Sequence, residues 1–422
     1  MSSHESHRWR SGEPPPPIRS HSLVKHRVLE EYLKRYVAAV TRNPRVDKLT
    51  LTIVDGFAGG NTYSDEKTGE LRPGSPSIIL NALNTAKVAA QERRKKQFVL
   101  DDHYFFIEKD VEAFGFLRDT LSSSEHGSRI GNAVHLVHGD FCDHVAKVIE
   151  SVRSRAGGEH AIFILDQCGY TDVPFVSIKE ILGSLRKSEV ILTFATGFLI
   201  DFLSDKYKGG AGIRKAGIDV ERLVSKIDKS DRHWKRLIQV ELRDDLQIKA
   251  GAGFSTPFFI RSRDSNRDLW LVHLSGHYRA RDVMMGIHWE HTNSFAHYGR
   301  PGLNMLGFDP DEGVSGPSQA LLPGFYFDET AKDLTLEATL RELPRFLTNK
   351  RDLIDVRSLF AEISNDTPAT VALLREVLKE LAADGVFEIR DKTGLTVRQK
   401  GVQFDTDVIH MARQMRLFGF GH

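Results

Sequence analysis

Short apolar segments alternate with helical ones along the first half of the chain, and this alternation limits the folds that the sequence can adopt. Segments 22–40 and 74–96 are predicted helices. Buried strands are predicted within five stretches: 51–65, 104–110, 133–141, 159–170 and 188–197. Strands separated by helices are typical of a parallel sheet wrapped by helices. Because such sheets bind ligands at the carboxyl ends of their strands, we expect an α/β fold with its site at that edge.

The end of this sheet carries a second signal. Segments 255–263 and 267–275 are joined by a short Asp-Ser-Asn turn and predict a β-hairpin. A parallel sheet that finishes in a hairpin distinguishes the class I methyltransferase variant of the Rossmann-like fold, because a plain dinucleotide-binding domain has no antiparallel last strand. We therefore expect a Rossmann-like class I methyltransferase sheet, parallel with an antiparallel last strand.

The C-terminal part has a different character. Residues 352–364 predict an amphipathic helix, and Thr367 and Pro368 predict the cap and first position of a second helix that Gly385 closes. Two strands around a Lys-Thr-Gly turn follow. This order predicts a winged helix-turn-helix. Its basic residues would contact phosphate, but acidic residues lie among them, so protein binding stays an alternative. The basic set is Arg375, Lys379, Arg390, Lys392 and Arg398.

The predicted organisation has three parts. Residues 1–20, which include four consecutive prolines, are expected to form a disordered tail. Residues 21–345 are assigned to the Rossmann-like methyltransferase domain, with a helical insertion near 198–250. Residues 346–422 are assigned to the winged-helix domain and a C-terminal tail.

Composition restricts the partners and the compartment. With a net charge of +1, nucleic-acid binding would depend on local basic patches. The two cysteines cannot build a disulfide framework or a four-thiolate zinc site, which fits a reducing cytosol. No apolar run reaches the ~18 residues that span a bilayer, and the N-terminus lacks the apolar region of a secretory signal. We expect a cytoplasmic protein.

Residues at successive strand ends match the needs of S-adenosylmethionine. Its methionine end must pass close to backbone, which requires glycine after the first strand. Its positive charges favour a carboxylate there, its ribose favours a carboxylate after the second strand, and its adenine amine favours an acceptor after the third. The predicted cofactor-binding residues are Asp55, Gly56, Phe57, Ala58 and Gly59 after the first strand, Glu108 after the second, and Asp140 with Phe141 after the third. Phe141 is expected to contact the adenine face.

The stretch Asp166–Tyr170 follows the fourth strand, where the methyl acceptor would bind. Amino-methyltransferases place an Asp/Asn/Ser-Pro-Pro-aromatic motif there, whose first residue accepts a hydrogen bond from the target amine while the aromatic ring stacks on the target base. Both prolines are absent here, and Tyr170 follows Asp166 by four residues instead of three. Either Asp166 is the acceptor, or Gln167 accepts through its amide oxygen, or the stretch is an ordinary turn. Tyr170 is the predicted stacking residue.

Several motifs together resemble the three-Cys-motif partner (TcmP) family. They are SLVKH (22–26), IVDGFAGG (53–60) with a downstream GSP (74–76), FFIEKD (105–110), GDF (139–141) and LDQCGY (165–170). The segment 271–289 and the winged-helix end resemble it too. The resemblance implies a bacterial or phage-associated S-adenosylmethionine-dependent methyltransferase that works beside a three-Cys-motif, radical-enzyme-like protein. The family more often has Asp-Pro-aromatic-Gly after the fourth strand, so Gln167 and Cys168 depart from it.

Two functions follow from these residues. The preferred hypothesis is methyl transfer to a nitrogen of DNA or RNA, and a base in a duplex would have to be flipped out of the stack. The alternative is a catalytically inactive module with the methyltransferase fold that binds nucleic acid or a partner protein. Asp55 and Glu108 favour the enzyme, whereas the altered stretch Asp166–Tyr170 favours the module. No metal site is expected, since the histidines after residue 270 fit polar groups that line a cleft.

Overall fold

The computed structural model describes residues 8–167, 172–194, 217, 234–261, 268–291, 296–297, 301–303, 325–348, 353–398 and 401–411. The chain forms two compact units, Met1–Ile287 and His288–His422. The predicted domain boundary near residue 345 falls inside the second unit. The reason is that α11 (Glu329–Thr348) buries Leu343 and Leu347 and packs on α13 (Val371–Ala383) of the winged helix.

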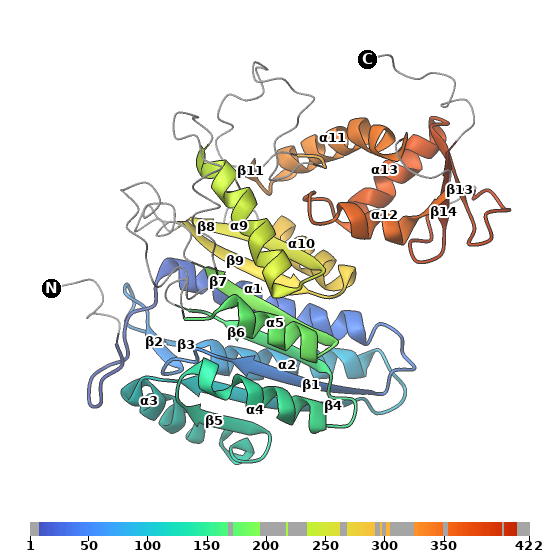
Figure 1. Cartoon of the computed structure of the whole chain (residues 1–422). Helices are drawn as coiled ribbons and strands as arrows, with labels where there is room; N and C mark the ends of the chain where they lie inside the picture. Colours follow the sequence, from blue (N-terminus) through green and yellow to red (C-terminus); the bar gives the residue numbers. More distant parts are fainter. Residues whose placement is uncertain are drawn as a thin grey trace. The chain divides into compact units, whose positions relative to one another are not determined.

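The first unit is built on a mixed sheet, whose strand order is β8-β9-β7-β6-β1-β4-β5 (Figure 1). Strands β1, β4, β5, β6 and β7 are parallel, whereas β9 pairs antiparallel with both β7 and β8. This is the class I methyltransferase sheet that the hairpin predicted. The strands are β1 (Lys48–Asp55), β4 (Val99–Glu108), β5 (Val134–His138), β6 (His160–Leu165), β7 (Lys187–Phe194), β8 (Phe254–Arg261) and β9 (Asp268–Ser275).

The centre of the sheet is buried on both faces. Every residue of β1, β6 and β7 after the first or second is buried, which explains why these strands read as continuous apolar runs. Helices α1 (Ser20–Val40) and α2 (Ser75–Glu92) pack together behind the sheet in Figure 1, and α4 (Phe141–Ser154) and α5 (Phe175–Ser184) lie in front. Helix α3 (Val111–Ser122) follows β4. Helix α1 begins two residues before its predicted start at residue 22, with Arg19 at its N-cap position.

Part of the predicted insertion near 198–250 is helical. Helix α9 (Trp234–Ala250) packs on α5 and on β8. Apart from this helix and Gly217, the insertion lies outside the described residues. None of the helices in the described part of the chain has both the length and the apolar character to cross a membrane.

The N-terminal segment 8–19 differs from the expected disordered tail, because it packs on the hairpin of β2 (Thr62–Ser64) and β3 (Leu71–Pro73). The backbone N–H of Ser64 donates to the carbonyl oxygen of Pro16 at 2.9 Å, and Ile18 N–H donates to the Ser64 carbonyl at 2.8 Å. The Ser64 hydroxyl donates to the Pro15 carbonyl at 3.0 Å. Prolines lack an N–H but keep their carbonyl acceptors, so the extended proline run can line the edge of β2.

The second unit contains the winged helix. Its described elements after α11 are β12 (Leu353–Asp355), α12 (Val356–Ile363), α13, β13 (Phe387–Arg390) and β14 (Val408–Met411), with β14 antiparallel between β12 and β13. Two short strands, β10 (Ala296–His297) and β11 (Phe325–Tyr326), precede them and pair with each other.

One local prediction for the winged helix is wrong, and another is confirmed only in part. The cap of α13 is Thr370, whose side chain accepts the Leu373 N–H, instead of Thr367 with Pro368 at the first position. The chain after the Lys-Thr-Gly turn pairs back on β13 as predicted, but through an antiparallel bridge of Arg390 with Val397 and not through a full strand. The regular strand beside β13 is the more distant β14.

Candidate functional site

Backbone hydrogen bonds to both neighbouring strands hold the turn after β1. The N–H of Gly56 donates to Ile164 on β6 at 2.9 Å, and the N–H of Ala58 donates to Ile107 on β4 at 3.0 Å. A Cβ at Gly56 would lie 2.8 Å from Cδ2 of Phe141, which is closer than real contacts. Glycine is therefore required at residue 56 by the ring beneath it, and the turn sits over the carboxyl ends of β4 and β6.

Asp55 ends β1 and is fully buried. Its Oδ1 accepts a hydrogen bond from the Phe57 N–H at 3.2 Å, and its Oδ2 has no hydrogen-bond partner in the described part of the chain. Burial, with smaller contributions from the charges of Asp166 and Glu108, raises the pKa of Asp55 to about 7, although hydrogen bonds from the Ser75 hydroxyl and the Phe57 N–H oppose this rise. A buried, unpaired carboxylate oxygen is costly unless a donor or cation meets it. Asp55 is therefore the group most clearly directed toward a ligand.

Glu108 closes the same turn from the end of β4. Its Oε2 accepts the Gly59 N–H at 2.8 Å, and its Oε1 accepts the Asp110 N–H at 2.7 Å. Each carboxylate oxygen can accept more than one hydrogen bond, so both remain able to meet a hydroxyl of a ligand. The predicted ribose acceptor thus lies within the site and also holds the glycine turn in place.

Asp140 and Phe141 have local structural roles. Asp140 caps α4 and accepts the Cys142 N–H at 3.0 Å. Phe141 is only 1% exposed and its ring centroid lies 6.3 Å from that of Phe57. The ring supports the turn from below, so the contact with adenine that we predicted for Phe141 has no exposed ring face in this structure.

Asp166, which follows β6, is paired with a lysine that the sequence analysis did not single out. The Nζ of Lys25 in α1 lies 2.6 Å from both carboxylate oxygens of Asp166. The Lys25 side chain is 12% exposed and that of Asp166 is 36% exposed. Burial raises the pKa of Asp166, but the charge and hydrogen bond of Lys25 outweigh burial and hold that pKa below its usual value. Asp166 is therefore an ionised acceptor close to Asp55.

His26 follows Lys25 and stays neutral. Burial, helped by the charge of Lys25, lowers the pKa of His26 to about 4, and the charge of Asp166 opposes this only in part. A neutral imidazole at physiological pH neither adds to the charge of Lys25 nor cancels it. The net charge beside Asp166 is thus set by the lysine.

The other predicted acceptor, Gln167, is turned into the protein. It is 2% exposed, and its Oε1 accepts the backbone N–H groups of Asp172 and Val173, both at 3.1 Å. The amide oxygen therefore shapes the loop after β6. Asp166 and Gln167 were the two predicted acceptors for the target amine, and Asp166 has the more accessible oxygen atoms. Tyr170 lies outside the described residues, together with Cys168.

The N-terminal segment places an indole ring on the glycine turn. A Cβ at Gly60 would lie 2.4 Å from Cδ1 and Nε1 of Trp9, and a Cβ at Gly59 would lie 2.8 Å from its Cη2. The Trp9 Nε1–H donates to the Thr62 carbonyl at 2.8 Å, and the ring meets that of Tyr63 edge-on at 5.1 Å. On this side of the turn, the close approach that we predicted for a ligand is made by the protein itself.

Sequence reasoning missed Lys25, His26 and Trp9. The first two lie in the motif SLVKH (22–26), which contributed to the TcmP resemblance but did not assign a role to its lysine or histidine. Helical periodicity says nothing about a residue 141 positions away, which is the separation of Lys25 from Asp166. Trp9 lay in a segment whose composition is typical of disorder, and nothing local connected it with the turn.

Most of the basic residues predicted to bind phosphate are engaged inside the second unit. Arg390 pairs with Glu388 at 2.6 Å, and Arg398 pairs with the buried carboxylate of Asp407 at 3.0 Å. The guanidinium of Arg375 lies over an aromatic ring, 5.7 Å from its centroid. The members of the set that form no ion pair or ring contact with described residues are Lys379 and Lys392.

Comparison with known proteins identifies one domain and several distant structural likenesses. Residues 307–394 match the family model described as GMT-like wHTH domain. Comparison with curated proteins finds no match. Protein LPL1258 from Legionella pneumophila is similar at 11% identity over 60% of this chain and 85% of that chain, with a TM-score of 0.34.

Two further solved structures are similar at the same level. The cofactor-bound protein Rv0187 from MTB has 11% identity over 61% of this chain and 88% of that chain, with a TM-score of 0.31. A SAM-dependent methyltransferase from Agrobacterium tumefaciens has 9% identity over 64% of this chain and 66% of that chain, with a TM-score of 0.30. The strand order and the antiparallel β9 identify the fold independently of these low scores. The TcmP resemblance remains a resemblance, because the matched family model covers the winged-helix region alone.

Proposed function

We propose that the chain is an S-adenosylmethionine-dependent methyltransferase that methylates a nitrogen of a nucleic acid. The observation that carries this proposal is Asp55, a buried carboxylate with an unpaired oxygen at the carboxyl edge of the sheet. Its pKa is raised chiefly by burial and to a smaller extent by the charges of Asp166 and Glu108, so three carboxylates share one neighbourhood. Such a cluster favours a cationic ligand, and S-adenosylmethionine carries a sulfonium and an ammonium group.

The residues around the turn would hold this cofactor. Asp55 would meet its positive charges, Glu108 its ribose hydroxyls, and Asp140 its adenine amine. When bound, it would supply an electrophilic methyl group, to which a nitrogen lone pair can bond as the carbon–sulfur bond breaks and S-adenosylhomocysteine leaves. The protein's contribution is to align the acceptor with that group and to exclude water.

Asp166 would orient the acceptor nitrogen by accepting a hydrogen bond from its N–H. Lys25 contacts both oxygens of Asp166, but each oxygen has a second lone pair that a substrate amine can use. Lys25 also keeps Asp166 ionised, which an acceptor requires. Tyr170 is proposed to stack on the target base.

The winged-helix unit supports a macromolecular substrate or partner. We propose DNA or RNA as the substrate and, from the TcmP resemblance, a three-Cys-motif protein as the partner. Only two of the five basic residues singled out in this unit form no ion pair or ring contact with described residues, so we propose that its contribution to phosphate binding is small. Most of the substrate affinity would then have to come from the first unit or from the partner.

Calorimetric titration with S-adenosylmethionine tests cofactor binding. We expect wild-type protein to bind, and Asp55→Asn and Glu108→Ala to bind at least about tenfold more weakly. Glu112→Gln is the matched control, since Glu112 is exposed in the first turn of α3, and its binding should equal that of the wild type. No binding, or equal binding by all four proteins, would rule out the proposed site.

Radiolabelled methyl transfer to separate pools of DNA, RNA and protein then identifies the substrate class. A second candidate function is a non-catalytic module, which is favoured by the pairing of Asp166 with Lys25 and by the engaged amide of Gln167. Cofactor binding without transfer to any pool, in the presence and absence of the partner, would establish the module instead of the enzyme.

A further inference from the structure

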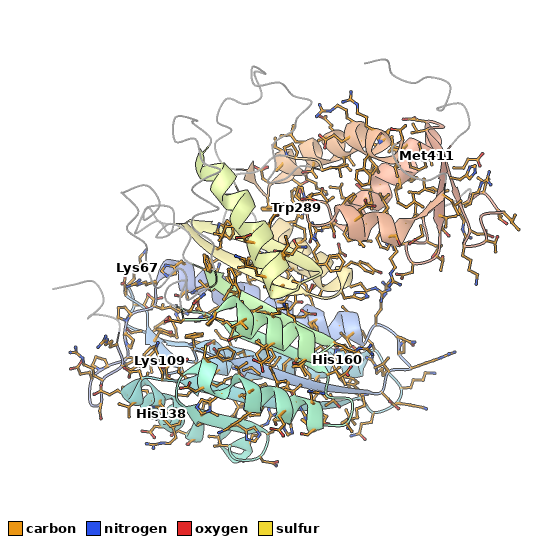
Figure 2. The ribbon with its side chains drawn as sticks, in the orientation of Figure 1. Lys67, Lys109, His138, His160, Trp289 and Met411 are labelled. Atoms are coloured by element: carbon orange, nitrogen blue, oxygen red, sulfur yellow. The ribbon has the colours of Figure 1, made fainter. Side chains whose placement is uncertain are left out.

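A cavity of about 320 Å³ lies at the amino ends of the strands, away from the candidate site. It is lined by the starts of β6 and β7, the second half of α1 and the first turns of α10 (Tyr278–Glu290). Figure 2 shows His160, the first residue of β6, at one end of the sheet, and Lys109 and His138, at the carboxyl ends of β4 and β5, at the other. No residue of the proposed methyltransferase site lines this cavity, which is called the amino-edge cavity below.

A buried hydrogen-bonded group supplies an acceptor to the amino-edge cavity. The Tyr32 hydroxyl donates to Oε2 of Glu189, and Nε2 of His273 lies 3.0 Å from the same oxygen. Burial and the charge of Glu189 raise the pKa of Tyr32 well above its usual value, so the hydroxyl remains a donor. Oε1 of Glu189 has no hydrogen-bond partner in the described part of the chain, and Glu189 lines the cavity.

A second pair supplies a donor. The Tyr36 hydroxyl and Nδ1 of His160 lie 2.7 Å apart. Burial lowers the pKa of His160 to about 4, with help from the charge of Lys187, and burial raises the pKa of Tyr36, so both groups are neutral. The pair holds one O–H and one ring N–H but shares only one hydrogen bond. Whichever group donates in that bond, the other hydrogen remains for a ligand.

The rim of the cavity is basic and much of its wall is apolar. Arg186 and Lys187 are exposed and form no ion pair with described residues, and Arg279 lines the same cavity. Three cations thus face one carboxylate, Glu189. The remaining wall is formed mainly by the aromatic rings and by small aliphatic side chains of α1 and α10. A basic rim around an apolar pocket with few polar groups is typical of sites for small organic anions.

We propose that the amino-edge cavity binds a small organic anion with a planar body that carries an N–H donor, of which a purine nucleoside monophosphate is the representative. The exocyclic amine of the purine would donate to Glu189, and a ring nitrogen would accept from the Tyr36–His160 pair. The phosphate would bind the cations of the rim. This inference does not depend on methyl transfer, because the two sites share no residue.

Equilibrium dialysis of the full chain with radiolabelled AMP tests the proposal. Each measurement is repeated with saturating S-adenosylhomocysteine, which would displace AMP from the adenosyl part of the methyltransferase site but not from the amino-edge cavity. We expect saturable AMP binding that S-adenosylhomocysteine leaves unchanged. The Arg186→Ala/Lys187→Ala variant should bind AMP at least about tenfold more weakly, because the phosphate loses two charge-assisted contacts. The matched control is Lys95→Ala/Lys96→Ala, which removes the same charge from exposed residues after α2 and should bind as the wild type does.

A second ligand tests the interior of the cavity without changing the protein. Inosine monophosphate has a carbonyl oxygen in place of the adenine amine and an N1–H in place of the N1 acceptor. In the proposed pose it would therefore face Glu189 with an acceptor and the Tyr36–His160 pair with a donor, and it should bind at least about tenfold more weakly than AMP. Equal affinity for the two nucleotides would overturn the assigned interior contacts and with them the proposal. The same holds if AMP does not bind saturably, if S-adenosylhomocysteine displaces it, or if the rim variant binds like its control.

Discussion

The burial of Asp55 carries an electrostatic cost that its hydrogen bonds in the folded protein offset only in part. Burial raises its pKa from the usual 3.8 to about 7. The unfolded chain therefore loses this proton near pH 4, whereas the folded chain keeps it until about pH 7, so the contribution of Asp55 to stability declines as the pH rises between these values. Above pH 7 the buried charge costs on the order of 4 kcal/mol. Residues kept despite such a cost are typical of functional sites.

Asp55→Asn should consequently stabilise the protein at pH 8 and weaken binding of S-adenosylmethionine. The gain in the free energy of unfolding should approach the cost of the buried charge, about 4 kcal/mol, and it should nearly vanish at pH 4, where Asp55 is protonated in the folded state. Urea denaturation at the two pH values measures this. A variant less stable than the wild type at pH 8 would show that the carboxylate is paired in the folded protein.

Lys25→Met should destabilise the protein by about 1–3 kcal/mol, because it leaves the carboxylate of Asp166 without its cation. Lys25→Arg should retain most of the stability, and the double variant Lys25→Met/Asp166→Asn should recover part of the loss. Denaturant titration of the wild type, Lys25→Met, Asp166→Asn and the double variant gives the coupling energy of the pair.

Lys34→Met is the control for this series. Lys34 lies on the same helix and pairs with Glu30 at 2.7 Å, but the two side chains are 28% and 45% exposed. Such a surface pair contributes less than about 0.5 kcal/mol. Equal losses from Lys25→Met and Lys34→Met would mean that the Lys25–Asp166 pair is no more than a surface ion pair.

The N-terminal segment and the β2–β3 hairpin act as one element beside the glycine turn. Ser64 receives or donates three hydrogen bonds with residues 15–18, and Trp9 covers Gly59 and Gly60. These contacts join the proline-rich N-terminal segment to the turn that follows Asp55. The conformation of the glycine turn therefore depends on a segment that lies about 40 residues earlier in the chain.

Deletion of residues 1–18 should loosen this turn. Amide hydrogen exchange in residues 56–64 should become at least about tenfold faster, because the local opening free energy loses several hydrogen bonds, while amides of β6 and β7 keep their protection. Trp9→Phe should have an intermediate effect, since it keeps a ring but removes the hydrogen bond to Thr62. Unchanged exchange after the deletion would show that the segment does not stabilise the turn.

The division into two compact units has a consequence for the whole molecule. Each unit has its own buried core, with β1, β6 and β7 in the first and α12, α13 and β14 in the second. Units of this kind can unfold separately. A ligand that binds one of them stabilises that unit by mass action.

Calorimetric unfolding should therefore show two transitions that respond to different changes. S-adenosylmethionine at 100 times its Kd should stabilise the first unit by about 2.7 kcal/mol and leave the second unchanged. Leu378→Ala removes a fully buried side chain of α13. It should lower the free energy of unfolding of the second unit alone, by about 2–5 kcal/mol. If the ligand and this substitution shift the same transition, the chain unfolds as one cooperative unit.

Local patterns in the sequence decided the architecture. Apolar runs, helical spacing and a short turn between two strands depend on neighbours within about ten residues, so they predicted the sheet, its hairpin and the winged helix. The same logic placed Asp55, Glu108 and Asp166 at one edge, because parallel strands end together. It failed at element boundaries, as in the cap of α13, where two threonines three residues apart offered equivalent caps.

Tertiary structure alone decided which groups meet at that edge. Lys25 reaches Asp166 from a helix 141 positions earlier, Trp9 covers the glycine turn from a segment that looked disordered, and Phe141 is buried beneath Gly56 instead of facing a ligand. These pairings depend on packing between distant segments, which no local periodicity encodes. Burial is also the main cause that raises the pKa of Asp55, and burial belongs to the assembled protein. The sequence could place a carboxylate beside the glycines, but only the folded chain could bury it with one oxygen unpaired among the described residues.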